Sequence, residues 1–98
     1  MGTSLRNAQF MLDSRLADAA RGDGEALYDL GICYSTGTAG VGIDLIEAHK
    51  WFNLAAIAGL ESAKSCRTDI AEDMTAREIA TAQAAARAWL QRTQRRAA

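Results

Sequence analysis

The fold is decided by two stretches of the chain, ALYDLGICYSTG at residues 26–37 and EAHKWFNLAA at residues 47–56. In both, apolar or small residues recur three and four positions apart, which is the spacing of one face of an α-helix. Gly31 has no side chain and lets the two helices approach closely, while Tyr34 and Phe52 fill the space between them. The two stretches therefore predict a pair of tightly packed helices.

The same spacing continues on both sides of this pair and predicts an all-α chain. Proline is absent and aromatic residues make up only 6% of the chain, which favours helices over strands. We expect Ser4, Asp23 and Asp44 to cap helix N-termini. Thr75 and Glu78 have the spacing of a capping box. The expected helices, followed by a frayed tail at residues 94–98, are Leu5–Ala20, Gly24–Thr36, 45–58, Glu61–Glu72 and Ala76–Thr93.

Composition and charge narrow the range of functions. The 98 residues, 49% apolar and 23% charged, make one small globular domain. A net charge of -1 gives no reason to expect a nucleic acid or an anionic membrane as partner. We expect Cys33 and Cys66 to be reduced, buried thiols rather than a disulfide. No apolar stretch has the length of a signal core or a membrane span, so the expected location is cytoplasmic.

An internal repeat underlies the helices. The apolar pattern from Leu12 to Ala20 recurs thirty-six residues later, from Ala48 to Ala56, and Gly22 recurs thirty-seven residues later as Gly59. A period of this size in pairs of helices indicates an α-solenoid, in which each helical hairpin buries its apolar face by stacking on its neighbours.

Residues 26–63 resemble one complete Sel-1-like repeat, a relative of the tetratricopeptide repeat. The resemblance rests on Leu-Gly-x-x-Tyr at residues 30–34, on Trp-Phe-x-x-Ala-Ala at residues 51–56, and on Asp44 and Gly59 between and after them. It implies a scaffold or adaptor that binds other proteins and has no chemistry of its own. It also implies a short α-solenoid of antiparallel helical hairpins, about five helices in a single domain over residues 1–98: an N-terminal half-repeat or cap at 1–22, an intact repeat at 23–59, and a degenerate repeat with a C-terminal capping helix at 60–98.

Few side chains could carry chemistry. His49 is the single histidine and has no second ligand one helical turn away, so we expect it to be exposed or half-buried rather than a metal ligand or general base. Asp69, Glu72 and Asp73 lack the alternating loop spacing of a calcium site and are expected to form a solvated face. We therefore expect no enzyme activity, no catalytic residue, no cofactor and no metal.

The resemblance also implies where a partner would bind, because the first helix of a tetratricopeptide-like hairpin lines the concave side. An exposed Tyr28 beside Ile32 would anchor a protein or peptide partner, since aromatic side chains contribute much of the energy of such contacts. Lys50 and Asn53 on the second helix are weaker candidates. The alternative is that Tyr28 and Ile32 pack against the first or last helix and leave no groove. The candidate binding residues on the first helix are Glu25, Tyr28, Asp29, Ile32 and Ser35.

Two other functions stay open. The last helix and the residues after it are rich in arginine and contain one acidic residue, Glu78, so this segment could bind a nucleic acid. Its many alanines leave few groups to contact bases, which makes this the weaker hypothesis. A homo-oligomer is the other possibility, formed if an incompletely capped end of the solenoid stacks on its copy. The arginines in question are Arg77, Arg87, Arg92, Arg95 and Arg96.

Overall fold

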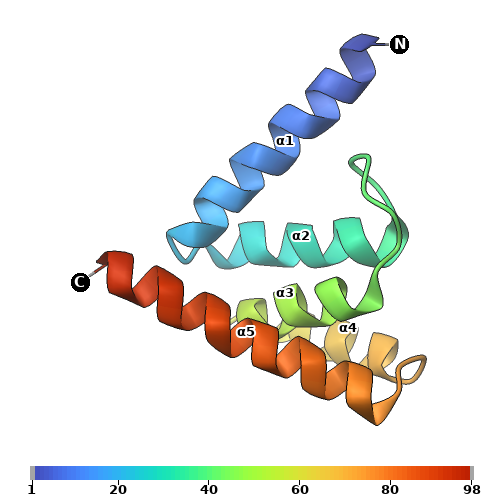
Figure 1. Cartoon of the computed structure of the whole chain (residues 1–98), viewed down its shortest axis with the longest axis vertical. Coiled ribbons are helices and arrows are strands. Elements are labelled where there is room, and N and C mark those ends of the chain that lie inside the picture. Colours follow the sequence, from blue (N-terminus) through green and yellow to red (C-terminus); the bar gives the residue numbers. More distant parts are fainter. Residues whose placement is uncertain (1, 98) are drawn as a thin grey trace.

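The computed structural model of the chain describes the backbone of residues 2–97 and the side chains of residues 6–94. Over the described backbone the chain is all-helical, as the sequence predicts, and contains no strand (Figure 1). The five helices are α1 (Gly2–Ala20), α2 (Gly24–Thr36), α3 (Leu45–Ile57), α4 (Glu61–Ala71) and α5 (Ala76–Ala97).

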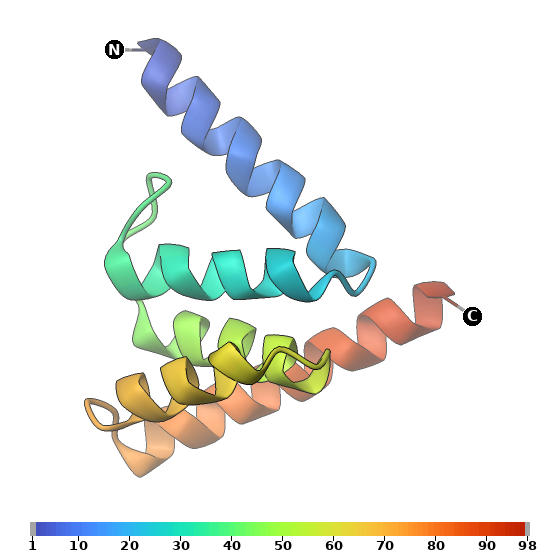
Figure 2. The ribbon, with the colours of Figure 1, turned by 180° about the vertical axis from the view of Figure 1, so that it is seen from behind.

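Helix α3 lies at the centre of the arrangement. Helices α2, α4 and α5 each pack against α3, whereas α1 packs mainly on α2. After the loop at residues 37–44, α3 runs back alongside α2, and α4 and α5 lie on the far side of α3 from α2 (Figures 1 and 2). Helix α1 meets α2 near the turn that joins them and slants away from it, so the N-terminal half of α1 stands clear of α3, α4 and α5.

The core forms around α3 because three helices cover it. Leu30 on α2 and Phe52 and Leu54 on α3 are the largest side chains that are fully buried. Alanines fill most of the remaining core and let the helices cross at short distances. The buried apolar residues are Ala19, Ala26, Leu27, Leu30, Ala48, Trp51, Phe52, Leu54, Ala55, Ala63, Ala82 and Ala86.

Two glycines allow this arrangement of α2 and α3. Gly31 is buried against the ring of Phe52, and a Cβ atom at residue 31 would lie 2.5 Å from the Cδ1 atom of that ring. Gly37 ends α2 in the left-handed conformation, with a φ of 78°, and donates its N–H to the carbonyl of Cys33. The close approach predicted at Gly31 is therefore confirmed.

Side-chain caps begin three of the helices where the sequence predicts them. The Asp23 carboxylate accepts a hydrogen bond from the N–H of Glu25 at 3.0 Å, and the Asp44 carboxylate accepts one from the N–H of Glu47 at 3.1 Å. At α5 the predicted capping box is reciprocal, since the Thr75 N–H donates to Glu78 and the Glu78 N–H donates to the Thr75 hydroxyl. These bonds satisfy N–H groups that have no partner within the helix.

The first and last helices each extend further at their outer ends than the sequence predicts. Helix α1 begins at Gly2, so Ser4 lies within the helix and is not its N-cap. Helix α5 continues to Ala97, through the residues that were expected to fray. Both extensions follow from helix cooperativity, because a residue added to an existing helix gains a hydrogen bond without the cost of nucleation.

No helix in the described part of the chain combines the length and the apolar character that crossing a membrane requires.

Candidate functional site

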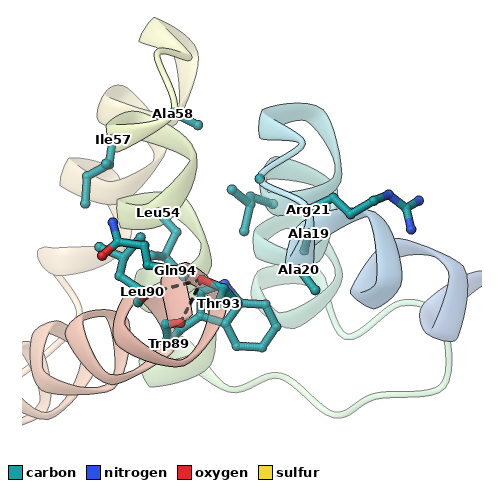
Figure 3. Close-up of a pocket in the computed structure, with 12 residues that line it drawn as sticks. Ala19, Ala20, Arg21, Leu54, Ile57, Ala58, Trp89, Leu90, Thr93 and Gln94 are labelled. Carbon is teal, nitrogen blue, oxygen red and sulfur yellow. Dashed lines mark hydrogen bonds between the residues drawn. The ribbon is translucent and has the colours of Figure 1, made fainter. Parts of the chain in front are cut away.

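An open cavity of about 310 Å³ lies where the C-terminal parts of α1, α3 and α5 meet (Figure 3). We call it the three-helix pocket. Helix α1 contributes Ala19 and Ala20, α3 contributes Leu54 and Ile57, and α5 contributes Trp89, Leu90, Thr93 and Gln94. Leu27 of α2 also lines the cavity. Most of these side chains are apolar, so the pocket suits an apolar group rather than a charged one.

Aromatic packing fixes the α5 wall of the three-helix pocket. The ring of Trp89 meets the ring of Trp51 edge to face, with centroids 4.8 Å apart and planes inclined by 77°. The Trp51 indole N–H donates to the Glu47 carboxylate at 3.1 Å, which orients that ring in turn. The Arg92 guanidinium also lies 5.7 Å from the centre of the Trp89 ring. Trp89 is therefore positioned by contacts with two side chains.

The rim of the pocket carries few polar groups. Arg21, in the turn after α1, forms an ion pair with Asp18 of that helix, and its side chain extends away from the cavity (Figure 3). Thr93 donates its hydroxyl hydrogen to the Trp89 carbonyl at 2.9 Å. Ile57 is 61% exposed at the mouth. With these residues the pocket can bind an apolar side chain, and its lining contains no carboxylate, histidine, cysteine or lysine.

Tyr28, the predicted anchor, is half-buried and faces the helices that follow it. Its ring lies 5.7 Å from the ring of Phe52, and its hydroxyl is 3.7 Å from the thiol of Cys66 on α4. The hydrogen bond with Cys66 raises the pKa of Tyr28, and the electrostatic effect of the Cys66 side chain raises it further. Ile32 is also half-buried and packs against the core. Both residues are therefore packed rather than exposed, but Tyr28 packs against α3 and α4 and not against the first or last helix, as the alternative expected.

The three other candidates on α2 differ in the contacts that they make within the chain. Asp29 forms an ion pair with Arg15 of α1, with 2.9 Å between the Arg15 Nε atom and the carboxylate. The Ser35 hydroxyl donates to the Ile32 carbonyl within α2. Glu25 is exposed at the start of α2.

The two candidates on α3 are occupied by contacts within the chain. Lys50 forms an ion pair with Glu47 and lies 4.2 Å from the centre of the Trp51 ring, and only 12% of its side chain is exposed. The side-chain amide oxygen of Asn53 accepts a hydrogen bond from Arg67 on α4 at 2.6 Å. Both side chains link parts of the fold to one another.

His49 is buried, with 3% of its surface exposed, and the expectation that it would be exposed or half-buried is wrong. The reason is that α4 covers the face of α3 that carries His49 and Asn53. Its Nδ1 atom is buried and has no hydrogen-bond partner among the described residues. Desolvation lowers the pKa of His49, and the nearby Arg67 guanidinium lowers it further.

This burial predicts a loss of stability in mild acid. The ordinary pKa of histidine is 6.5 and that of folded His49 lies below it, so the unfolded chain binds a proton first as the pH falls. Stability should therefore decrease below pH 6.5, by at most about 1.4 kcal/mol per pH unit from this one group. Urea unfolding at several pH values between 7.5 and 5.5 measures the slope. Because the chain has one histidine, His49→Gln should lose most of that slope, and an unchanged slope would contradict the assignment.

The arginine-rich segment is only partly described. Arg77, Arg87 and Arg92 are exposed on α5, and Arg92 lies against Trp89. The side chains of Arg95 and Arg96 lie outside the described residues. Among the described residues, no group of three or more His, Cys, Asp or Glu is placed to bind a metal ion.

Sequence reasoning missed the three-helix pocket. Leu54 and Ile57 lie on a different side of α3 from Ala48, Phe52 and Ala55. This second apolar face of the helix was the available signal in the sequence. In comparisons with known proteins, no family model, no curated protein and no solved structure matches this chain.

Proposed function

We propose that the chain is a protein-interaction module that binds an apolar side chain of a partner protein in the three-helix pocket. The observation that carries this proposal is an open, mostly apolar cavity of about 310 Å³ in whose α5 wall Trp89 is held by contacts with Trp51 and Arg92. A preformed pocket loses little conformational entropy when it binds, because its side chains are already ordered. Large apolar side chains that fill such pockets supply much of the affinity of protein complexes.

The order and packing of the helices support a short α-solenoid of the Sel-1-like kind. Helices α2 and α3 lie side by side, joined by the loop at residues 37–44, and α3 also contacts the next helix, α4. Such an arrangement stacks helical pairs so that each buries the face left open by its neighbour. Modules of this kind present a rigid surface to a partner, which agrees with a role as scaffold or adaptor.

The proposed binding site is the three-helix pocket and not the predicted surface around Tyr28. The side chains of Tyr28, Lys50 and Asn53 are in contact with other residues of the chain. Ile57, in contrast, is 61% exposed and borders the cavity. The mouth of the pocket therefore offers apolar contact that the fold itself does not use.

The proposal predicts a selective effect of charge at the pocket. In a pull-down from a lysate of the source cell, treated with nuclease, Ile57→Glu should reduce recovery of the bound protein tenfold or more, because a buried charge at an apolar contact costs at least about 1.4 kcal/mol. Ile43→Glu is the matched control, since Ile43 is 67% exposed on the loop before α3 and does not line the pocket. Equal recovery with both variants would contradict the pocket assignment. Recovery that nuclease abolishes, and that falls steeply with added salt, would favour the nucleic-acid hypothesis instead.

A further inference from the structure

Helix α1 exposes two large apolar side chains to solvent. Phe10 is 75% exposed and Met11 is 55% exposed, although both are large apolar residues within a helix. The residues that face α2 are Leu12, Leu16 and Ala19, which are half-buried or buried. At 100° per residue, Phe10 projects from the side of α1 opposite to them. An exposed aromatic side chain at this position marks a surface that another helix can cover.

The spacing on this side of α1 is that of a two-helix seam. Asn7, Phe10, Ser14 and Ala17 are all exposed and follow one another at intervals of three, four and three residues. This is the heptad spacing at which one helix packs along another. Phe10 and Ala17 are its apolar members, whereas Asn7 and Ser14 are polar, and the small side chains at residues 14 and 17 allow close approach. We call these four residues, together with Met11 beside them, the outer stripe of α1.

The charges beside the outer stripe identify the partner. Arg6 and Asp13 are exposed and lie seven residues apart, so both flank the outer stripe along the same edge of α1. Arg6 precedes Phe10 along the helix and Asp13 follows it. In an antiparallel pair of α1 helices related by a two-fold axis near Phe10, Arg6 of each copy faces Asp13 of the other. One arrangement thus forms two ion pairs and brings the two Phe10 rings together. A second copy of this chain therefore supplies the opposite charge for both ion pairs, and no other partner is needed.

The shape of the molecule leaves room for this pairing. The N-terminal half of α1 stands clear of α3, α4 and α5 in both views (Figures 1 and 2). A second α1 can therefore lie along the outer stripe while both copies keep their α1–α2 contact. We infer that the chain forms an antiparallel dimer through the outer stripe of α1, with Arg6 of each copy paired to Asp13 of the other. This inference is separate from the proposed function, because the stripe and the three-helix pocket share no residue.

A charge-exchange experiment tests the dimer. Sedimentation velocity of the full chain over about a hundredfold range of concentration should give a particle of twice the 10.5 kDa chain mass that dissociates on dilution. Arg6→Asp and Asp13→Arg should each weaken dimerisation about tenfold or more, because both ion pairs become contacts between like charges. An equimolar mixture of the two variants should dimerise again, since each copy of one then complements the other.

Matched controls separate this result from a general effect of charge. Arg87→Asp changes an exposed arginine on α5 and should leave the dimer intact, and Ile57→Glu in the three-helix pocket should do the same. Phe10→Asp should give a monomer, whereas Ile43→Glu should not, and circular dichroism checks that each variant keeps its helices. A wild-type monomer at every concentration, a dimer indifferent to the Arg6 and Asp13 reversals, or a variant mixture that stays monomeric would overturn the inference.

Discussion

Replacing Gly31 with alanine is expected to lower the free energy of unfolding by about 2 kcal/mol, and replacement with valine by more, because both overpack the core where α2 crosses α3. A Cβ atom at residue 31 would lie 2.5 to 2.9 Å from three carbons of the Phe52 ring, well inside contact distance. The ring cannot move aside, since Phe52 is 1% exposed and packs against Tyr28. This clash should exceed the gain of about 1 kcal/mol that alanine brings to a helix interior relative to glycine.

Urea unfolding and thermal melting of the Gly31 variants measure this effect. For a domain of this size, about 2 kcal/mol corresponds to a decrease in Tm of roughly 10 °C. Gly42→Ala is the control, because a Cβ atom there meets nothing within 4 Å and the expected change is within about 0.5 kcal/mol. Combining Gly31→Ala with Phe52→Leu should cost less than the two separate changes together, since leucine makes room for the new methyl group. A Gly31→Ala protein more stable than wild type would show that α2 and α3 do not meet as closely as described.

The paired helices α2 and α3 could be predicted from sequence because local signals agree there. Helical spacing, a cap at Asp44, a glycine at the crossing and the large ring of Phe52 all indicate the same arrangement, and the structure contains each of them. When capping, pattern and packing signals agree, a sequence specifies its local structure well.

The burial of His49 and Leu54 could not be predicted in the same way. A single apolar stripe assumes that a helix is covered on one side, but α3 is covered by α2, α4 and α5. The number of neighbours that a helix has is a property of the tertiary structure, and the spacing of its own residues indicates it only weakly. A histidine on a covered face looks, from sequence alone, like one on an open face.

The candidate site was harder to predict for a related reason. The three-helix pocket joins the ends of α1, α3 and α5, so the residues that line it are distributed over three separate segments of the chain. The predicted binding residues lie on α2 and α3 and rest on a resemblance, which gives no information about the ends of α1 and α5. The structure instead places Tyr28 against Phe52 and Cys66, where it contributes to packing.

Replacing Trp51 with alanine is expected to have the largest effect of any single change proposed, about 3 to 5 kcal/mol, because it leaves a cavity at the junction of α3 and α5. Trp51 is 2% exposed, and its ring supports Trp89 edge to face. A loss of this size is a large fraction of the roughly 5 to 15 kcal/mol that stabilises a typical domain. It should lower the Tm by about 15 °C or more.

Trp51→Phe separates the contributions of the ring and of the indole N–H. Phenylalanine keeps an aromatic ring beside Trp89 but removes the hydrogen bond to Glu47, so we expect a loss of only about 1 to 2 kcal/mol. In urea unfolding, Trp51→Ala should therefore be much less stable than Trp51→Phe. If the two variants lost equal stability, the hydrogen bond to Glu47, rather than packing against Trp89, would carry the contribution of this residue.

The Trp51 variants also connect stability with the proposed function. Since Trp51 fixes the ring that forms the α5 wall of the three-helix pocket, Trp51→Ala should allow Trp89 and the C-terminal half of α5 to move while α2 and α3 remain paired through Gly31 and Phe52. Limited proteolysis below the melting temperature should then cut the alanine variant first in α5, and cleavage should be slower in Trp51→Phe. First cleavage within α2 or α3 instead would show that α5 does not depend on the Trp51–Trp89 contact for its position.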